Sequence, residues 1–129
     1  MPHLLLVEDD PNSRKALGLL LKWANYSLDF AEDGLKAVEM WKRGGYDLVL
    51  MDIQMPGLNG FEATCAIREM ERERGGYTPI VAITAHAFKE DEEQCLACGM
   101  DAFISKPIDI DKCILLIGQI IKQKACGVN

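Results

Sequence analysis

Asp47-Leu48-Val49-Leu50-Met51-Asp52 is an apolar run that ends abruptly in a carboxylate. An apolar run of this length, bounded by residues that favour turns, is typical of a strand buried on both faces of a sheet. Asp52 would then stand at the carboxyl end of this strand, at the mouth of a crevice rather than in the core. Other polar residues are candidates for the same site if they also stand at the carboxyl ends of strands.

Other apolar runs also lead into polar residues. These runs, each with the polar residues at its end, are Leu4–Val7 with Glu8 and Asp9, Ile80–Ile83 with Thr84, and Phe103–Ser105 with Lys106. Parallel strands present their carboxyl ends at one edge of a sheet, where ligands bind. Acids, a hydroxyl and an amine are therefore expected together at that edge.

Strands and helices are expected to alternate along the chain. The expected strands are Leu4–Val7, Ser27–Ala31, Asp47–Asp52, Pro79–Thr84 and Ala102–Ser105. The expected helices run from Pro11 to about Asn25, from Asp33-Gly34 to Gly44-Gly45, between Asn59 and Gly75, from about Phe88 to Cys98, and from Ile108 or Asp109 to about Lys124. Alternation of this kind, with mostly apolar strands, predicts a parallel sheet covered by helices on both faces.

The fold class is therefore α/β, a flavodoxin-like doubly wound sheet of five strands in the order 2-1-3-4-5, with five helices in a three-layer sandwich. The whole chain, residues 1–129, is expected to form a single domain. In that strand order the ligand site lies outside the carboxyl ends of the first and third strands. Glu8, Asp9 and Asp52 stand at those ends.

Two helices allow more detailed expectations. Asp10 precedes Pro11, which predicts that Asp10 caps the first helix rather than binds a ligand. In the second helix, Leu35, Val38 and Trp41 share one face. The segment Arg68–Arg74 alternates arginine with glutamate and is expected to be a solvated helix face.

Composition excludes several classes of function. Content of 49% hydrophobic and 26% charged residues is that of a globular domain, and no apolar run approaches the roughly 20 residues of a membrane span. The net charge of -6 argues against nucleic-acid binding. No secretion signal is recognisable, and the odd count of five cysteines suits reduced thiols, so a cytoplasmic location is expected. Cys95 and Cys98 form a C-x-x-C that is better explained by two small helix residues than by a zinc or redox site.

The grouped polar residues suggest phosphoryl chemistry. Carboxylates gathered without a cation would repel one another, and oxygen ligands suit Mg²⁺ or Mn²⁺ rather than zinc. A metal would attract a phosphoryl group, to which Thr84 could offer a hydroxyl and Lys106 a positive charge. Asp52, the lone acid after the central strand, is the candidate nucleophile for an acyl phosphate.

Each of these residues also has a simpler interpretation. Glu8 and Asp9 could be exposed loop acids, and Asp52 could cap a turn. Thr84 alone would be an ordinary strand residue, and Lys106 alone a solvated cation. Their joint position at four strand ends favours a site over coincidence.

At this point the sequence resembles the receiver domain of two-component response regulators. The motifs that carry the resemblance are Val7-Glu8-Asp9-Asp10, Met51-Asp52-Ile53-Gln54-Met55-Pro56 with Asn59-Gly60, Ile83-Thr84-Ala85, and Phe103-Ile104-Ser105-Lys106-Pro107. The residues in these motifs are especially similar to those in receivers attached to hybrid histidine kinases. The chain could be such a receiver or a stand-alone regulator, and the sequence does not separate these two.

The resemblance implies a role for each site residue. Asp52 would accept phosphate from a phosphohistidine on a histidine kinase or a histidine phosphotransfer protein. Asp9, Asp52 and the backbone carbonyl of Gln54 would bind Mg²⁺, and Glu8 would assist through water. Lys106 would pair with the phosphate, and Lys106-Pro107 would be a cis peptide.

The resemblance also implies a switch. Thr84 would move toward the phosphate and Phe103 would turn inward, which would alter the surface of the fourth helix, fifth strand and fifth helix. Such a domain catalyses its own phosphoryl transfer and dephosphorylation rather than acting as an enzyme on other substrates. Gln54 and His86 resemble positions that tune phosphoryl lifetime. The output would pass through a downstream protein or a self-dimer.

Two rival functions share this architecture. A flavin- or nucleotide-binding module would need a phosphate-binding loop after the first strand, where Glu8 and Asp9 would repel a phosphate. The second rival is a receiver-like interaction module that is never phosphorylated. The complete set of acids, threonine and lysine argues against the second rival.

Overall fold

The computed structural model describes residues 2–53, 60–84, 89–106 and 108–125. Five parallel strands form one sheet in the order β2-β1-β3-β4-β5, as the sequence predicts. The strands are β1 (His3–Val7), β2 (Ser27–Ala31), β3 (Leu48–Asp52), β4 (Ile80–Thr84) and β5 (Ala102–Ser105). Every residue of β3 is buried, which explains why the strand is apolar at every position before Asp52 rather than at alternate positions.

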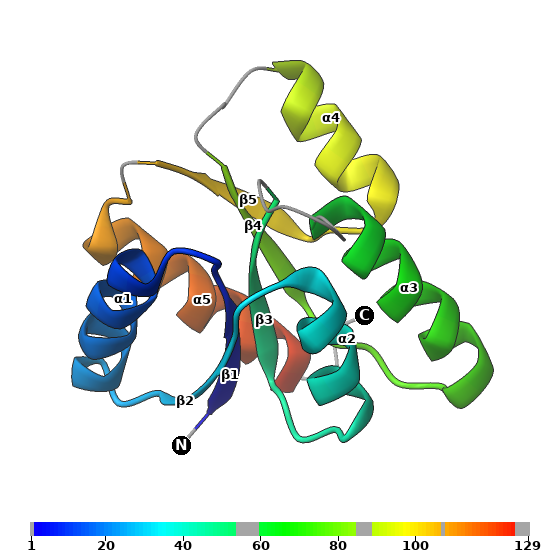
Figure 1. The fold of residues 1–129 in the computed structure, drawn as a ribbon, viewed down its shortest axis with the longest axis horizontal. Coiled ribbons are helices and arrows are strands. Elements are labelled where there is room, and N and C mark those ends of the chain that lie inside the picture. Colours follow the sequence, from blue (N-terminus) through cyan, green and yellow to red (C-terminus); the bar gives the residue numbers. More distant parts are fainter. Residues whose placement is uncertain (1, 54–59, 85–88, 107, 126–129) are drawn as a thin grey trace.

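Helices cover both faces of the sheet (Figure 1). The helices are α1 (Pro11–Trp23), α2 (Gly34–Lys42), α3 (Gly60–Arg74), α4 (Lys89–Cys98) and α5 (Ile110–Ala125). On one face, Leu17 and Leu21 of α1 and Ile117 of α5 pack into a core with Leu4 and Leu50. The helices α2 and α3 pack on the other face. This three-layer arrangement leaves the carboxyl ends of the strands accessible at one edge.

Local sequence signals explain where several helices begin. The Asp10 side chain accepts hydrogen bonds from the Asn12 amide at 3.2 Å and the Ser13 hydroxyl at 2.8 Å, so the predicted cap of α1 is confirmed. Asp33 caps α2 by accepting from the Lys36 amide at 2.7 Å. These caps satisfy amide groups that have no partner within the helix.

Three expectations about the helices need correction. The first helix ends at Trp23 rather than near Asn25, because Asn25 adopts a left-handed conformation with φ 70°. The last helix begins at Ile110, after Asp109, whose side chain accepts from the Lys112 amide. Leu35 does not share the buried face of α2, since 61% of it is exposed.

The buried face of α2 explains the exposure of Leu35. It consists of Gly34, Ala37, Val38 and Trp41. Successive helix residues are about 100° apart, which turns Leu35 away from the line through Val38 and Trp41.

None of the helices in the described ranges has the length and apolar character needed to cross a membrane.

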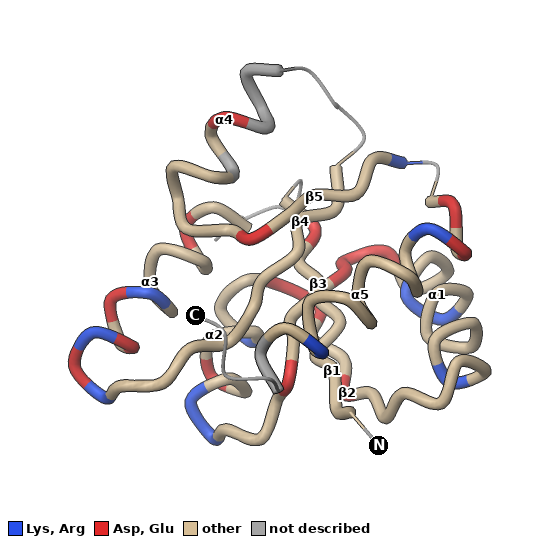
Figure 2. Tube along the Cα trace, turned by 180° about the vertical axis from the view of Figure 1, so that it is seen from behind, with Lys and Arg blue, Asp and Glu red and all other residues tan. Residues whose placement is uncertain are grey.

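The charged second half of α3 is only partly a solvated face. Figure 2 shows its acidic and basic residues alternating, but the Arg68 side chain is only 10% exposed and Glu71 is also buried. The Arg68 guanidinium donates to the Glu71 carboxylate at 2.7 Å and to the Gly99 carbonyl at 2.8 Å. It also donates to the Thr78 carbonyl at 2.9 Å and to Asp101 at 3.0 Å.

Arg68 therefore joins α3 to the segments that precede β4 and β5. A fifth contact, to the Tyr77 hydroxyl at 3.1 Å, means that all of its guanidinium hydrogens have acceptors. The expectation of a solvated face holds for Arg72 and Arg74, which are exposed, and is wrong for Arg68 and Glu71.

We predict that Arg68→Met lowers the free energy of unfolding by about 3 kcal/mol, because it leaves the buried Glu71 carboxylate without its cation. Urea denaturation measures this change. Arg72→Met is the matched control on the same helix and should change stability by less than about 0.5 kcal/mol. Equal stability of the two variants would contradict a structural role for the Arg68 contacts.

Candidate functional site

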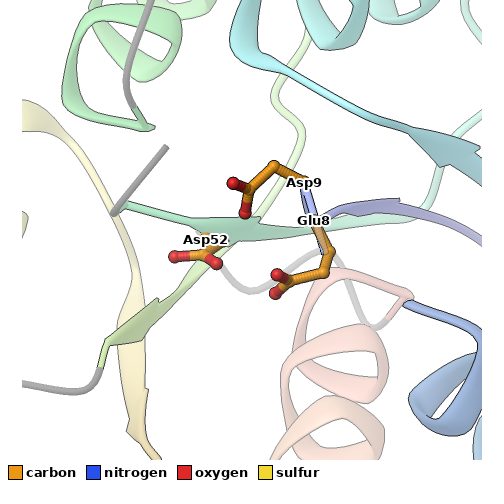
Figure 3. A group of neighbouring side chains, drawn as sticks. All are labelled: Glu8, Asp9 and Asp52. Atoms are coloured by element: carbon orange, nitrogen blue, oxygen red, sulfur yellow. The ribbon is translucent and has the colours of Figure 1, made fainter. Parts of the chain in front are cut away.

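Parallel pairing of β1 with β3 brings the first two groups of site residues together. Val7 pairs with Met51, so the residues that follow them, Glu8 and Asp52, come out side by side at the sheet edge. The Glu8 amide continues the ladder by donating to the Ala31 carbonyl at 3.0 Å. Figure 3 shows the carboxylates gathered at this edge.

Glu8, Asp9 and Asp52 form a compact acidic group. One carboxylate oxygen of each lies within 4.8 Å of the others. Asp52 stands at the carboxyl end of β3, as expected, but it is only 1% exposed, so it lies beneath the mouth of the site rather than open to solvent. Glu8 is also buried, at 4% exposure, whereas Asp9 is exposed. The group thus opens to solvent on the Asp9 side.

Lys106 supplies a positive charge to the two buried acids. Its Nζ lies 3.1 Å from Asp52 Oδ2 and 3.7 Å from Glu8 Oε2. Burial alone would lower the pKa of Lys106, but the hydrogen bond to Asp52 and the surrounding carboxylates raise it. Lys106 is therefore a charged ammonium at neutral pH.

One cation does not balance the acidic group. Burial, followed by the hydrogen bond and charge of Asp52, raises the pKa of Glu8 from 4.5 to about 7. The Asp10 amide, which donates to Glu8 Oε1 at 3.2 Å, and Lys106 act in the opposite direction. The raised pKa of Glu8 therefore reflects its burial first and the neighbouring Asp52 carboxylate second, and Lys106 opposes them only in part.

The fourth and fifth strands deliver the remaining predicted residues. Thr84 is the last residue of β4 and is buried, and its carbonyl accepts from the Lys106 amide at 2.7 Å. Phe103 in β5 is partly buried against the core cluster that includes Ala82 and Met100. Gln54, His86 and the Lys106-Pro107 peptide involve residues outside the described ranges.

Two residues that sequence reasoning did not assign to the site support it. Arg14 of α1 donates from Nη1 to the Glu8 carbonyl at 2.8 Å and so fixes the loop that carries the first two acids. No local pattern marks Arg14, because its partner is a backbone carbonyl six residues earlier. Gly60 begins α3 where an added Cβ would lie 2.8 Å from the Asp52 carbonyl and 2.7 Å from Ile53 Cα. The sequence marked Gly60 only as part of a loop motif.

The donor set suits a hard divalent cation. All candidate side-chain ligands are carboxylate oxygens, and the described part of the site contributes no thiol or imidazole to the group. Such a set fits Mg²⁺ or Mn²⁺, which keep positions for water and phosphate oxygens. A divalent cation would also neutralise the charge that raises the pKa of Glu8.

Residues 4–117 match the family model described as "Response regulator receiver domain". The chain belongs to the response regulator receiver family. This receiver is 40% identical over 128 residues to hybrid signal transduction histidine kinase I of Dictyostelium discoideum, covering 95% of this chain and 7% of that protein. It is 42% identical over 108 residues to the sensor protein GacS of Pseudomonas syringae, covering 83% of this chain and 12% of that protein.

The receiver spans only a small part of these relatives. Among solved structures, it resembles the receiver domain of sensor histidine kinase PA1611 from Pseudomonas aeruginosa, which has magnesium coordinated in its active-site cleft. The TM-score is 0.85 at 35% identity, covering 94% of this chain and 98% of that chain. It also resembles the receiver domain of Ssk1 from Saccharomyces cerevisiae, solved with the histidine phosphotransfer protein Ypd1. That likeness has a TM-score of 0.90 at 31% identity and covers 96% of this chain and 91% of that chain.

These likenesses confirm the family and the flavodoxin-like fold class predicted from the sequence. The chain is a receiver domain of phosphorelay systems. This result argues against the alternative that the chain is a flavin- or nucleotide-binding module. The roles of the individual site residues stay predictions.

We predict that the metal-free receiver loses stability as pH rises from about 5 to about 8. Glu8 holds its proton to about pH 7 in the folded chain, against 4.5 as the ordinary value, so the folded state binds the extra proton between these limits. Urea denaturation in chelator measures the trend. Glu8→Gln should flatten it, and Glu69→Gln, on an exposed helix face, should not. A stability that rises across this range would contradict the raised pKa of Glu8.

We predict that Gly60→Ala lowers the free energy of unfolding by about 2 kcal/mol, because the new methyl group overlaps the backbone that follows Asp52. Gly118→Ala is the matched control in α5, where the added Cβ meets only the Tyr26 hydroxyl at 3.8 Å. The control should gain up to about 1 kcal/mol from helix propensity. Equal responses of the two variants to urea would refute close approach at Gly60.

Proposed function

We propose that Asp52 is the phosphoacceptor of this receiver and takes its phosphoryl group from a phosphohistidine on a histidine kinase or a histidine phosphotransfer protein. The observation that carries this proposal is the contact between the buried Asp52 carboxylate and Lys106 Nζ, at 3.1 Å, beside two further carboxylates. A phosphoryl transfer site needs a carboxylate and an ammonium held together in this way, shielded from water at the end of a strand.

Asp52 is a better nucleophile than its neighbours. Glu8 holds a proton up to about pH 7, which reduces its nucleophilic form at neutral pH. Asp9 is exposed to solvent and receives no hydrogen bond from Lys106, which donates to Asp52. In the proposed transfer an Asp52 oxygen forms a bond to phosphorus as the phosphorus–nitrogen bond breaks, and the imidazole keeps the electron pair. Lys106 would then pair with a phosphoryl oxygen.

The acidic group would hold the metal that this step requires. Asp9 and Asp52 would bind Mg²⁺, or Mn²⁺, directly, with Glu8 acting through water and the Gln54 carbonyl as a further ligand. When bound, the cation neutralises charge on the transferring phosphoryl group. The magnesium-containing PA1611 receiver supports this part of the proposal.

Phosphorylation would act as a switch. The phosphoryl group adds a charge of about -1.5 to -2 and three acceptor oxygens close to Thr84, which ends β4. Thr84 would turn toward the phosphate, and Phe103 would move further into the core. Because α4 follows β4 in the chain, these changes would alter the α4-β5-α5 surface.

The wider role follows from the same chemistry. The chain would act as one receiver domain, residues 1–129, in the cytoplasm, and would catalyse its own phosphorylation and dephosphorylation. The phosphodonor would be a histidine kinase or phosphotransfer protein, as the Ssk1 receiver solved with Ypd1 suggests. The phosphorylated surface would contact a downstream protein or a second copy of the receiver. The chain could belong to a hybrid histidine kinase, as its relatives do.

We expect that acetyl phosphate with magnesium adds one phosphoryl group to the receiver, because Asp52 provides the nucleophile. Intact-mass measurement should show the addition in wild type, no addition in Asp52→Asn, and none with chelator. Asp47→Asn is the matched control at the other end of the same apolar run and should still be phosphorylated.

An unphosphorylated but folded wild-type receiver would favour the alternative, a receiver-like interaction module that is never phosphorylated. Addition that persists in Asp52→Asn would move the acceptor to another residue. Circular dichroism distinguishes both results from loss of fold.

We further propose that His86 and Gln54 adjust phosphoryl lifetime, because they follow Thr84 and Asp52 by two residues. His86→Ala should change the rate at which the isolated phosphorylated receiver loses its phosphoryl group. Intact mass over time measures this rate. Equal rates in wild type and His86→Ala would rule out the role of His86.

A further inference from the structure

Two cysteines that the phosphoryl site does not use lie next to each other between α3 and α4. Cys65 belongs to α3, and Cys98 is the last residue of α4. Figure 1 shows these two helices adjacent on the side of the sheet away from α1 and α5. The cysteines are thus distant in sequence but close in the fold.

Arg68 explains why the two cysteines meet. Residues three apart share a helix face, so Cys65 and Arg68 point in the same direction from α3. Arg68 Nε donates to the carbonyl of Gly99, the residue after Cys98, at 2.8 Å. The end of α4 is therefore fixed against the face of α3 that carries Cys65.

The two thiols are neighbours. The Cys98 thiol interacts with the Cys65 thiol, and both are free cysteines. Cys65 is exposed, whereas Cys98 is partly buried. A surface cavity of about 410 Å³ lined by Arg68, Arg72 and Cys98 gives small molecules access to the second thiol.

We propose that Cys65 and Cys98 form a reversible disulfide between α3 and α4 when the protein meets a peroxide. The peroxide oxygen–oxygen bond breaks as the Cys65 sulfur takes one oxygen to form a sulfenic acid, and the first water leaves with the other oxygen. The Cys98 sulfur then attacks the Cys65 sulfur, and a second water leaves. Two thiols and one hydrogen peroxide thus give one disulfide and two waters.

The environments of the two thiols set the order of these steps. Burial, followed by the proximity of Cys65, raises the pKa of the Cys98 thiol, so Cys98 stays protonated at neutral pH. Peroxide reaches the exposed Cys65 sulfur more readily than the partly buried Cys98 sulfur, so Cys65 is oxidised first. Cys113 is buried in the core between the sheet and α5, where burial raises its pKa to about 11, so it takes no part.

The disulfide would join two helices that are now held by hydrogen bonds and packing. It would close a loop from Cys65 to Cys98 that contains β4 and nearly all of α4. The end of α4 could not leave α3 while the bond persisted. A thiol reductant would restore its freedom, so the pair would link the position of α4 to the redox state of the cell.

The test uses the full chain with Cys95→Ser and Cys126→Ser, so that only Cys65, Cys98 and the buried Cys113 remain. Treatment with hydrogen peroxide, followed by maleimide labelling, should give a loss of two hydrogens and two fewer maleimide adducts. Dithiothreitol should reverse both changes. Trypsin should release a linked pair of peptides, Gly44–Arg68 joined to Glu90–Lys112, in which Cys65 and Cys98 are the only thiol residues.

Cys65→Ser and Cys98→Ser in the same background should each abolish the two-hydrogen loss and the linked peptides. Circular dichroism confirms that each variant is folded before oxidation. The proposal is overturned by the absence of the linked peptides after peroxide treatment, by a two-hydrogen loss that survives either substitution, or by sulfinic acid at Cys65 as the sole product. Because no phosphodonor is present, these outcomes are independent of whether Asp52 is phosphorylated.

Discussion

The attraction between the Lys106 ammonium and two buried carboxylates is the interaction on which the rest of the site depends. Glu8 and Asp52 are both nearly inaccessible to water, and they come from adjacent strands that cannot separate without breaking the sheet. Lys106 reaches them from the end of β5, across the width of β4. The strand order is therefore a requirement of the chemistry, because any order that moved β5 away would take the Lys106 ammonium from the two buried acids.

A second cation performs a comparable task at the opposite edge of the sheet. Arg68 contacts the segments that enter β4 and β5, whereas Lys106 lies where β5 ends. The two cations differ in chemistry as their tasks require. Arg68 uses a rigid, fully bonded guanidinium to hold three chain segments in place, while Lys106 presents a single ammonium that can exchange one anionic oxygen for another.

Sequence reasoning succeeded where the deciding physics is local and failed where it is not. Apolar runs identified the strands, and the acid before Pro11 identified a helix cap, because burial and capping act over a few residues. The burial of Asp52 depends on how β1, β3 and α3 surround it, and no single run encodes that. Arg68 was interpreted as solvated because its acceptors come from five other positions in the chain. Arg14 was missed for the same reason, since it binds a carbonyl rather than a side chain.

The attachment of α4 at one end restricts the ways in which that helix can move. Arg68 holds the Gly99 carbonyl, directly after the end of α4, and Gly99 adopts φ +102°, a conformation that favours glycine. A displacement of α4 that keeps this bond moves the Lys89 end more than the Cys98 end. Over a helix of this length, about 15 Å, a small angular change becomes a much larger linear shift at Lys89 than at Cys98. The helix is thus a lever whose fulcrum lies at the edge of the sheet farthest from Asp52.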